Sequence, residues 1–206
     1  MEIHSTEEQQ VEAIKTFWKE YGSSIVLGAA LGLGGLFGWN YYTDSQQASA
    51  EAASAAYQQI VTNSASDAAI VSAAETFAAE HKEPGYDALL QLLAAKAAVA
   101  DGDLDKAKTA LKQVMDSKVG GGLPEVASIR YARIQAQQGE LDGALATLDG
   151  VKAESFDAKV AEVRGDILVR QGNTEEAAKA YQAAIDAGTM SAASLQMKLD
   201  NLNVAG

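Results

Sequence analysis

The sequence has 206 residues, a net charge of −12 and no cysteine. The lack of cysteine excludes disulfides and thiolate metal sites, and the negative charge disfavours nucleic-acid binding because it repels phosphate groups. Alanine is abundant and there are only two prolines, a composition that favours helices throughout the chain. We therefore expect an all-α protein.

Residues 1–22 form the first segment. They hold five acidic and two basic side chains, and aromatic and apolar residues recur among them at helical spacing. We interpret this part as an amphipathic helical segment with a net negative charge.

An uncharged stretch follows at 23–42, and most of it reads IVLGAALGLGGLFGWNYY. A helix of about 20 residues crosses the hydrocarbon core of a membrane, which is about 30 Å thick. Glycine is a poor helix former in water, but it is common in membrane helices. In lipid, a backbone group without a hydrogen bond costs more free energy than in water, which favours the helix. Aromatic rings at both ends suit the two membrane interfaces. We therefore predict a transmembrane helix over 23–42.

Glycines in this stretch are spaced four residues apart, Gly28 with Gly32 and Gly34 with Gly38. Small residues at this spacing let a second membrane helix approach closely. Glycine pairs are also frequent in membrane helices that have no such partner. The pattern leaves two alternatives, a packing site for another helix or glycines that are merely tolerated.

Ala48-Ser49-Ala50 resembles a signal-peptide cleavage site, so a cleaved secreted protein is the main alternative to an anchor. A signal peptide opens with a basic segment and is cleaved soon after its apolar core. This chain opens with an acidic segment, and the small residues come well after the apolar core. These features favour an uncleaved anchor.

The orientation follows from lysine and arginine. Lys15 and Lys19 directly precede the stretch, whereas the first basic residue after it is Lys82. Basic residues collect on the cytoplasmic side of a membrane helix. We expect a cytoplasmic N-terminus and a C-terminal part on the other side of the inner membrane, which is the periplasm in a Gram-negative cell.

Three similar segments follow the stretch. Residues 102–107 read GDLDKA, 139–144 read GELDGA and 172–177 read GNTEEA, at offsets of 37 and 33 residues. A period near 34 residues is typical of tetratricopeptide helix–turn–helix repeats, whose neighbours stack to bury their apolar faces.

The register around each glycine agrees with such repeats, because small residues that allow helices to cross closely recur before and after it. They are Ala95, Ala132 and Gly165 before it, and Ala107, Ala144 and Ala177 after it. We predict a tetratricopeptide-like domain over 43–206, with clear repeats over about 86–118, 124–151 and 155–188 and atypical helices over 46–81 and 190–203.

No catalytic constellation is evident. The two histidines, His4 and His81, are separated by the predicted membrane helix and cannot share a site. Carboxylate pairs are numerous, but they lie beside turns and at helix starts, where the helix dipole favours them. We expect no enzyme activity, no cofactor, no metal and no small-molecule substrate.

The concave face of a repeat stack is a different kind of candidate site. In the tetratricopeptide pattern the first helix of each pair lines this face. The candidates for a partner-binding groove are Leu92, Lys96, Ile129, Arg133, Glu162 and Asp166. Two interpretations of this face remain. The apolar members are either core residues or part of a groove that binds a peptide or a partner helix.

The N-terminal quarter carries a recognisable pattern, EEQQVEAIKTFWKEYG at 7–22 followed by the glycine-rich stretch and Gly38-Trp39. With the repeats behind it, the whole chain resembles the YfgM family, ancillary subunits of the bacterial Sec translocon. The resemblance implies a single-span inner-membrane protein with a short cytoplasmic N-terminus and a periplasmic repeat domain. It also implies that the protein associates with SecYEG and the periplasmic chaperone PpiD.

The leading hypothesis is a non-enzymatic, membrane-anchored scaffold that assists chaperone action on exported proteins beside the translocon. One alternative is a regulator of envelope stress signalling that acts through its cytoplasmic tail. A second is the cleaved, secreted repeat-domain binding protein described above.

Overall fold

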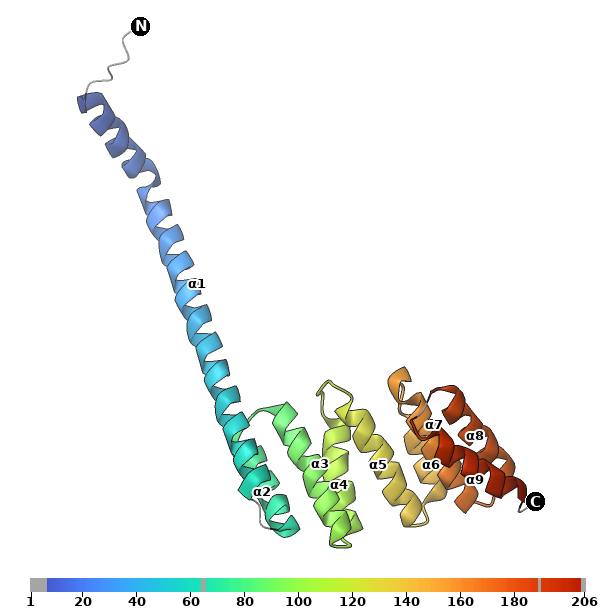
Figure 1. Ribbon diagram of the computed structural model, residues 1–206. Coiled ribbons are helices and arrows are strands. Elements are labelled where there is room, and N and C mark those ends of the chain that lie inside the picture. Colours follow the sequence, from blue (N-terminus) through green and yellow to red (C-terminus); the bar gives the residue numbers. More distant parts are fainter. Residues whose placement is uncertain (1–6, 64–65, 189, 205–206) are drawn as a thin grey trace. The chain divides into compact units, whose positions relative to one another are not determined.

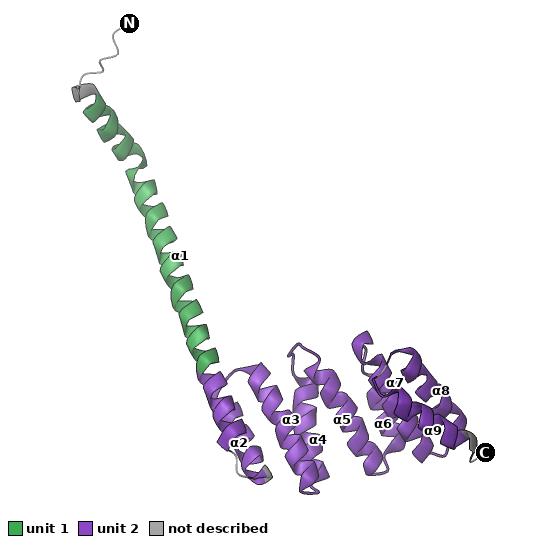
Figure 2. Cartoon of the chain, in the orientation of Figure 1, with its two compact units in different colours: residues 1–51 green, residues 52–206 purple. Residues whose placement is uncertain are grey.

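The computed structural model describes residues 7–63, 66–188 and 190–204, and every regular element within these residues is a helix (Figure 1). The predicted all-α fold is confirmed. His4 and the start of the predicted N-terminal segment lie outside the described residues. The chain divides into two compact units, residues 1–51 and 52–206 (Figure 2).

The first helix, α1, runs unbroken from Glu7 to Asn63. The glycines at 28–38 do not interrupt it. It also continues through the expected start of a separate helix at 46, so that residues 46–62 are its C-terminal part rather than an independent element. The sequence between 43 and 46 contains neither proline nor glycine, so nothing in it stops the helix.

The apolar side chains of α1 between 25 and 42 are exposed. Phe37 and Trp39 are 73% and 66% exposed. Among the described residues, α1 is the one helix that is long and apolar enough to cross a membrane. A core helix of a soluble protein would bury these side chains, so their exposure distinguishes α1 from that case.

Unit 2 begins with the last turns of α1, where Ala53 is fully buried. Its helices are α2 (Asp67–Glu80), α3 (Pro84–Ala100), α4 (Leu104–Asp116), α5 (Leu123–Gln137), α6 (Leu141–Asp149), α7 (Asp157–Arg170), α8 (Thr174–Asp186) and α9 (Ala192–Val204), with a short 3₁₀ helix, η1 (Glu154–Phe156), before α7. Successive helices pack against each other along the chain (Figure 1).

The three glycines of the repeated segments, Gly102, Gly139 and Gly172, all have a left-handed backbone with φ near 80°. Each ends a helix in the same way, because the amide after the glycine donates to a carbonyl five residues back. These bonds are Asp103 N to Ala98 O, Glu140 N to Gln135 O and Asn173 N to Leu168 O, at 2.8–2.9 Å. Glycine adopts this conformation without steric cost, which explains its recurrence.

The small residues of the predicted register are buried where the helices cross. Ala107, Ala144 and Ala177 have no exposed surface. Gly165 on α7 packs against the ring of Tyr181 on α8, so closely that a Cβ atom at this glycine would overlap the ring. The register therefore records close packing within helix pairs, as predicted.

Alanine forms much of the core, together with a few large side chains. One cluster joins the end of α1 to α2, α3, α4 and α5 and includes Phe77, Leu90 and Leu111. A second cluster joins α5, α6 and α7, and α9 covers α8 with Leu195 and Leu199. Each helix buries its apolar face only by contact with its neighbours, as repeat architectures require.

Candidate partner-binding surface

Four of the six predicted groove residues lie on α3 and α5, and they differ in exposure. Leu92 and Ile129 are only 8% and 4% exposed and belong to the hydrophobic clusters. Lys96 and Arg133 are exposed. The two apolar residues therefore support the fold, whereas the two cations are open to a partner.

The acidic candidate Glu162 on α7 is engaged within the domain. It is 9% exposed, and its Oε2 atom lies 2.8 Å from Lys159 Nζ. Its Oε1 atom lies 3.9 Å from Arg133 Nη2, which links α7 to α5. A carboxylate held in this way stabilises the packing of the repeats and is not free for a partner.

Asp166, one turn further along α7, is also engaged. Its Oδ1 atom accepts hydrogen bonds from the Tyr181 hydroxyl at 2.8 Å and from Lys198 Nζ. Burial, reinforced by this hydrogen bond to Asp166, raises the pKa of Tyr181 far above its usual range. The hydroxyl therefore stays protonated as a donor, and Asp166 connects α7 to both α8 and α9.

A hollow of about 290 Å³ opens between α3, α4 and α5. Its apolar lining residues are Ala95, Val99, Leu111 and Ile134, and its polar ones are Lys96, Arg130, Arg133 and Gln137. The hollow thus combines an apolar lining with three cations. It brings Lys96 and Arg133 together.

A second hollow, of about 230 Å³, adjoins the first between α5 and α7. The two share Arg133 and Gln137, and the second also includes Asp166 and Arg170. Arg170 donates from Nη1 to the carbonyl of Ala136 at 3.0 Å. The first helices of successive pairs therefore present a continuous, mainly basic track.

Arg130 and Gln137 were not among the residues predicted for the groove. They lie three residues before and four residues after Arg133, which places all three on one face of α5. Helical spacing from Arg133 is the signal that finds them.

Another hollow, of about 480 Å³, lies between α2, α3 and α4 and has carboxylates in its lining. Two of these already have partners. Asp103 caps α4 by accepting from the amide of Lys106 at 3.0 Å, which lowers the pKa of its carboxyl. Asp105 accepts from Gln138 at 3.2 Å. These contacts stabilise helix ends and do not define a binding site.

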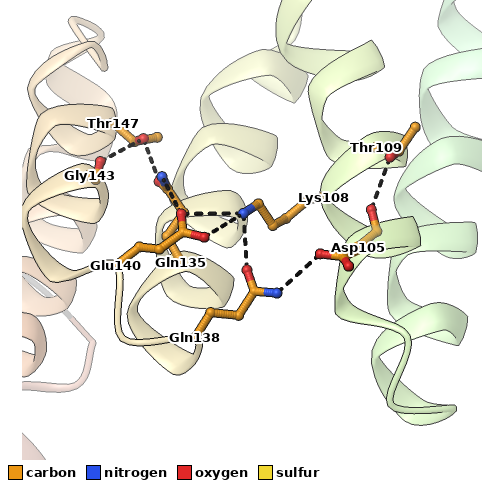
Figure 3. A network of polar contacts seen from close by, with 8 residues as sticks. All are labelled: Asp105, Lys108, Thr109, Gln135, Gln138, Glu140, Gly143 and Thr147. Atoms are coloured by element: carbon orange, nitrogen blue, oxygen red, sulfur yellow. Dashed lines mark hydrogen bonds and ion pairs between the residues drawn. The ribbon is translucent and has the colours of Figure 1, made fainter.

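A polar network links α4 to the turn between α5 and α6 (Figure 3). Lys108 Nζ donates to Glu140 Oε1 at 2.9 Å and to Gln138 Oε1 at 3.0 Å. The hydrogen bond between Lys108 and Glu140 raises the pKa of Lys108 and lowers that of Glu140. The network ties one repeat to the next.

The same network continues into α6. Gln135 Nε2 donates to Glu140 Oε2 at 3.3 Å, and the Thr147 hydroxyl lies 2.7 Å from Gln135 Oε1. The side chains point toward one another in Figure 3. We assign this cluster to repeat packing because its polar groups satisfy one another. Among the described residues, no group of three or more metal-ligating side chains gathers at any position.

The candidate glycines on α1 are exposed, and a Cβ atom added at Gly28, Gly32, Gly34 or Gly38 meets no atom within 4 Å. At about 100° per residue, Gly28 and Gly32 lie on one face, and Gly34 and Gly38 lie about a third of a turn away. The two pairs therefore face different directions. Gly35, which the sequence analysis did not select, shares the face of Gly28 and Gly32.

Comparisons with known proteins agree with this architecture. A family model described as a tetratricopeptide repeat-like domain matches residues 15–204. The crystal structure of apo PlcR from Bacillus thuringiensis is similar in fold, with a TM-score of 0.56 and 16% identity over 79% of this chain and 70% of that chain. The chain is a tetratricopeptide repeat-like protein with an N-terminal apolar helix.

Curated relatives narrow the assignment. A protein of Escherichia coli named "Ancillary SecYEG translocon subunit" is 40% identical over 99% of this chain and 100% of its own length. A protein of the same name from Haemophilus influenzae is 33% identical over 95% of this chain and 97% of its own length. The chain belongs to this family of ancillary SecYEG translocon subunits, which confirms the resemblance drawn from the sequence.

Proposed function

We propose that this chain is a non-enzymatic scaffold, anchored in the inner membrane by α1, that associates with the SecYEG translocon. The observation that carries the proposal is the exposed apolar stretch of α1, continuous with a helical-repeat unit, in a chain whose relatives are named translocon subunits. Asp103 caps α4, and Glu162 and Asp166 are engaged in contacts between helices. These three carboxylates therefore have structural partners, which supports a non-enzymatic role.

The proposed topology places residues 1–22 in the cytoplasm, the membrane helix at 23–42 and the repeat domain at 43–206 in the periplasm. Lys15 and Lys19 before the span support it. Ala48, Ser49 and Ala50 lie inside α1, where the backbone is hydrogen-bonded. A helical backbone is a poor protease substrate compared with an exposed loop, which supports an uncleaved anchor.

The chaperone role is part of the same proposal. A repeat domain held beside the translocon would meet exported chains as they emerge, and PpiD is the partner chaperone that the family resemblance implies. Purification of the tagged full chain in mild detergent, at native expression, tests both associations. We expect SecY, SecE and PpiD in the purified complex. Absence of SecYEG would overturn the scaffold proposal, and absence of PpiD alone would overturn its chaperone part.

We also propose that the glycine pairs of α1 seat against another membrane helix. Open space around all four glycines leaves room for a close neighbour. Replacement of Gly28 and Gly32 by leucine, and separately of Gly34 and Gly38, should lower the recovery of SecYEG for the pair that makes the contact. Leu31→Ile with Leu33→Ile is the control, because it keeps the span and its bulk. Unchanged recovery for both pairs would contradict the contact.

A further inference from the structure

The hollow between α3, α4 and α5 carries positive charge that the protein neutralises only in part, at Arg133. Within the described residues, Lys96 and Arg130 form no hydrogen bond or ion pair, and Arg133 reaches Glu162 only at 3.9 Å. None of the described residues that line this hollow is acidic. The chain as a whole has a net charge of −12, so this local excess of cations is contrary to its overall charge.

The same hollow exposes an apolar side chain. Val99 is 41% exposed. Within the helices from Pro84 to Asp186, the only other large apolar residue that is exposed is Val169, at 39%. Val99 lies beside Ala95, Leu111 and Ile134 in the lining. A volume of about 290 Å³ is suited to one or two apolar side chains of a peptide, rather than to a cofactor.

We propose that this basic hollow binds an acidic segment of a partner protein. An apolar side chain of that segment packs beside Val99, and its carboxylates pair with Lys96, Arg130 and Arg133. The inference rests on the proposed scaffold function, because it gives a surface to the contact that a scaffold needs. Charge complementarity selects the partner, because the three cations repel basic side chains of a partner and attract acidic ones.

The adjoining hollow supports an extended contact. Arg133 and Gln137 line both hollows, and Arg170 continues the basic track toward the end of α7. The acid in that second hollow, Asp166, is already held by Tyr181 and Lys198. A bound acidic segment that continues along the track therefore meets Arg170 next, without a free carboxylate to oppose it.

Fluorescence anisotropy on the full chain in non-ionic detergent tests the inference. The probe is a short labelled peptide of leucine, glutamate and glutamine, compared with a peptide in which lysine replaces glutamate. We expect the acidic probe to bind, and its binding to weaken as salt rises. Equal binding of the lysine peptide, or no binding of the acidic one, would overturn the inference.

Variants localise the contact. Lys96→Glu, Arg130→Glu and Arg133→Glu together should weaken binding of the acidic probe by about tenfold or more. The matched control is Lys82→Glu, Lys118→Glu and Lys152→Glu, which changes the net charge equally at three exposed loop positions. We expect the control to bind within about twofold of the unmodified chain, since exposed charges far from a site are screened. Equal losses in both variants would mean non-specific attraction and overturn the inference.

Three further measurements separate the other outcomes. Lys96→Gln with Arg130→Gln removes only unpaired, exposed charges, so a loss of binding there cannot come from misfolding. If light scattering instead shows a dimer that the triple glutamate variant breaks, the hollow holds a second copy, which overturns the acidic-partner inference. Recovery of SecYEG with the unmodified chain distinguishes failure of this inference from failure of the scaffold proposal.

Discussion

Phe37 and Phe77 are the same residue type, both in helices, yet Phe37 on α1 is 73% exposed and Phe77 on α2 is 2% exposed. In unit 2, Phe77 belongs to a cluster of apolar side chains that are buried against neighbouring helices. In unit 1, between 25 and 42, they have no such neighbours within the described residues. The difference teaches that apolar content alone does not define a core. The exposed apolar stretch of unit 1 has the length and composition of a candidate membrane span, whereas unit 2 supplies its own apolar surroundings.

The strongest way to break this comparison is to place charge in the span. Leu31→Asp with Leu33→Asp should cost roughly 6 kcal/mol of insertion free energy, since each central charge costs about 3 kcal/mol. We expect alkaline carbonate to extract this variant from membranes. The matched control places aspartate at Val61 and Val169, which are exposed apolar positions of unit 2. Retention of the span variant in the membrane would contradict the assignment of α1.

A second comparison removes the same ring from each unit. Phe77→Ala should lower the stability of unit 2 by about 3–5 kcal/mol, because it deletes a buried ring and leaves a cavity. Phe37→Ala, at an exposed position, should leave the unfolding of unit 2 unchanged. Denaturant unfolding of the full chain in detergent, followed by circular dichroism, measures both. Equal midpoints for the two variants would contradict the burial of Phe77.

A third comparison tests close packing within the repeats. Gly165→Ala should lower stability by about 1–3 kcal/mol, because the added methyl group overlaps the buried Tyr181 ring. Gly85→Ala is its counterpart on α3, where a Cβ atom meets nothing within 4 Å. There, alanine should maintain or raise the thermal midpoint. A more stable Gly165→Ala variant would refute the proposed crossing of α7 and α8.

The smallest effect concerns Glu140. Its pKa is lowered from 4.5, first by the hydrogen bond from Lys108 and then by that from Gln135. A lowered pKa means that the carboxylate contributes stability above pH 4.5 and that this contribution is lost as the pH falls through the folded-state pKa. Glu140→Gln should slightly lower the thermal midpoint at neutral pH and show less further loss below pH 4.5.

The control for this prediction is Glu80→Gln, because Glu80 is exposed and forms no ion pair within the described residues. It should change neither the midpoint nor the pH dependence appreciably. If Glu140→Gln and Glu80→Gln give the same pH profile, the network in Figure 3 does not stabilise the repeats.

The sequence predicted those features that depend on local spacing. The turn glycines, the small residues at the crossings and the apolar stretch each leave a periodic or compositional signal, because each is set by the backbone or by one helix face. The prediction that a separate helix starts at 46 was wrong, because α1 continues to Asn63. A helix continues unless a residue stops it. Periodicity alone places no such stop.

The candidate partner-binding surface was less predictable because it depends on contacts between distant residues. Asp166 is held by Tyr181 and Lys198, which are 15 and 32 positions away. Its spacing marked it as a groove residue, but only the packing of α8 and α9 shows that it is engaged. Leu92 and Ile129 likewise became core residues once neighbouring helices covered them. Arg130 was missed, although its spacing from Arg133 was a usable signal.

The central claim is that α1 crosses the membrane once and separates residues 1–22 from the repeats. The chain has no cysteine, so single cysteines at Lys15, Leu33 and Lys152 can be labelled without background. With a membrane-impermeant maleimide on closed spheroplasts, we predict labelling at 152 alone, and labelling at 15 only after the membrane is opened. Position 33 should stay protected from labelling both in closed spheroplasts and after the membrane is opened. Labelling of position 15 or 33 in closed spheroplasts would contradict the claim.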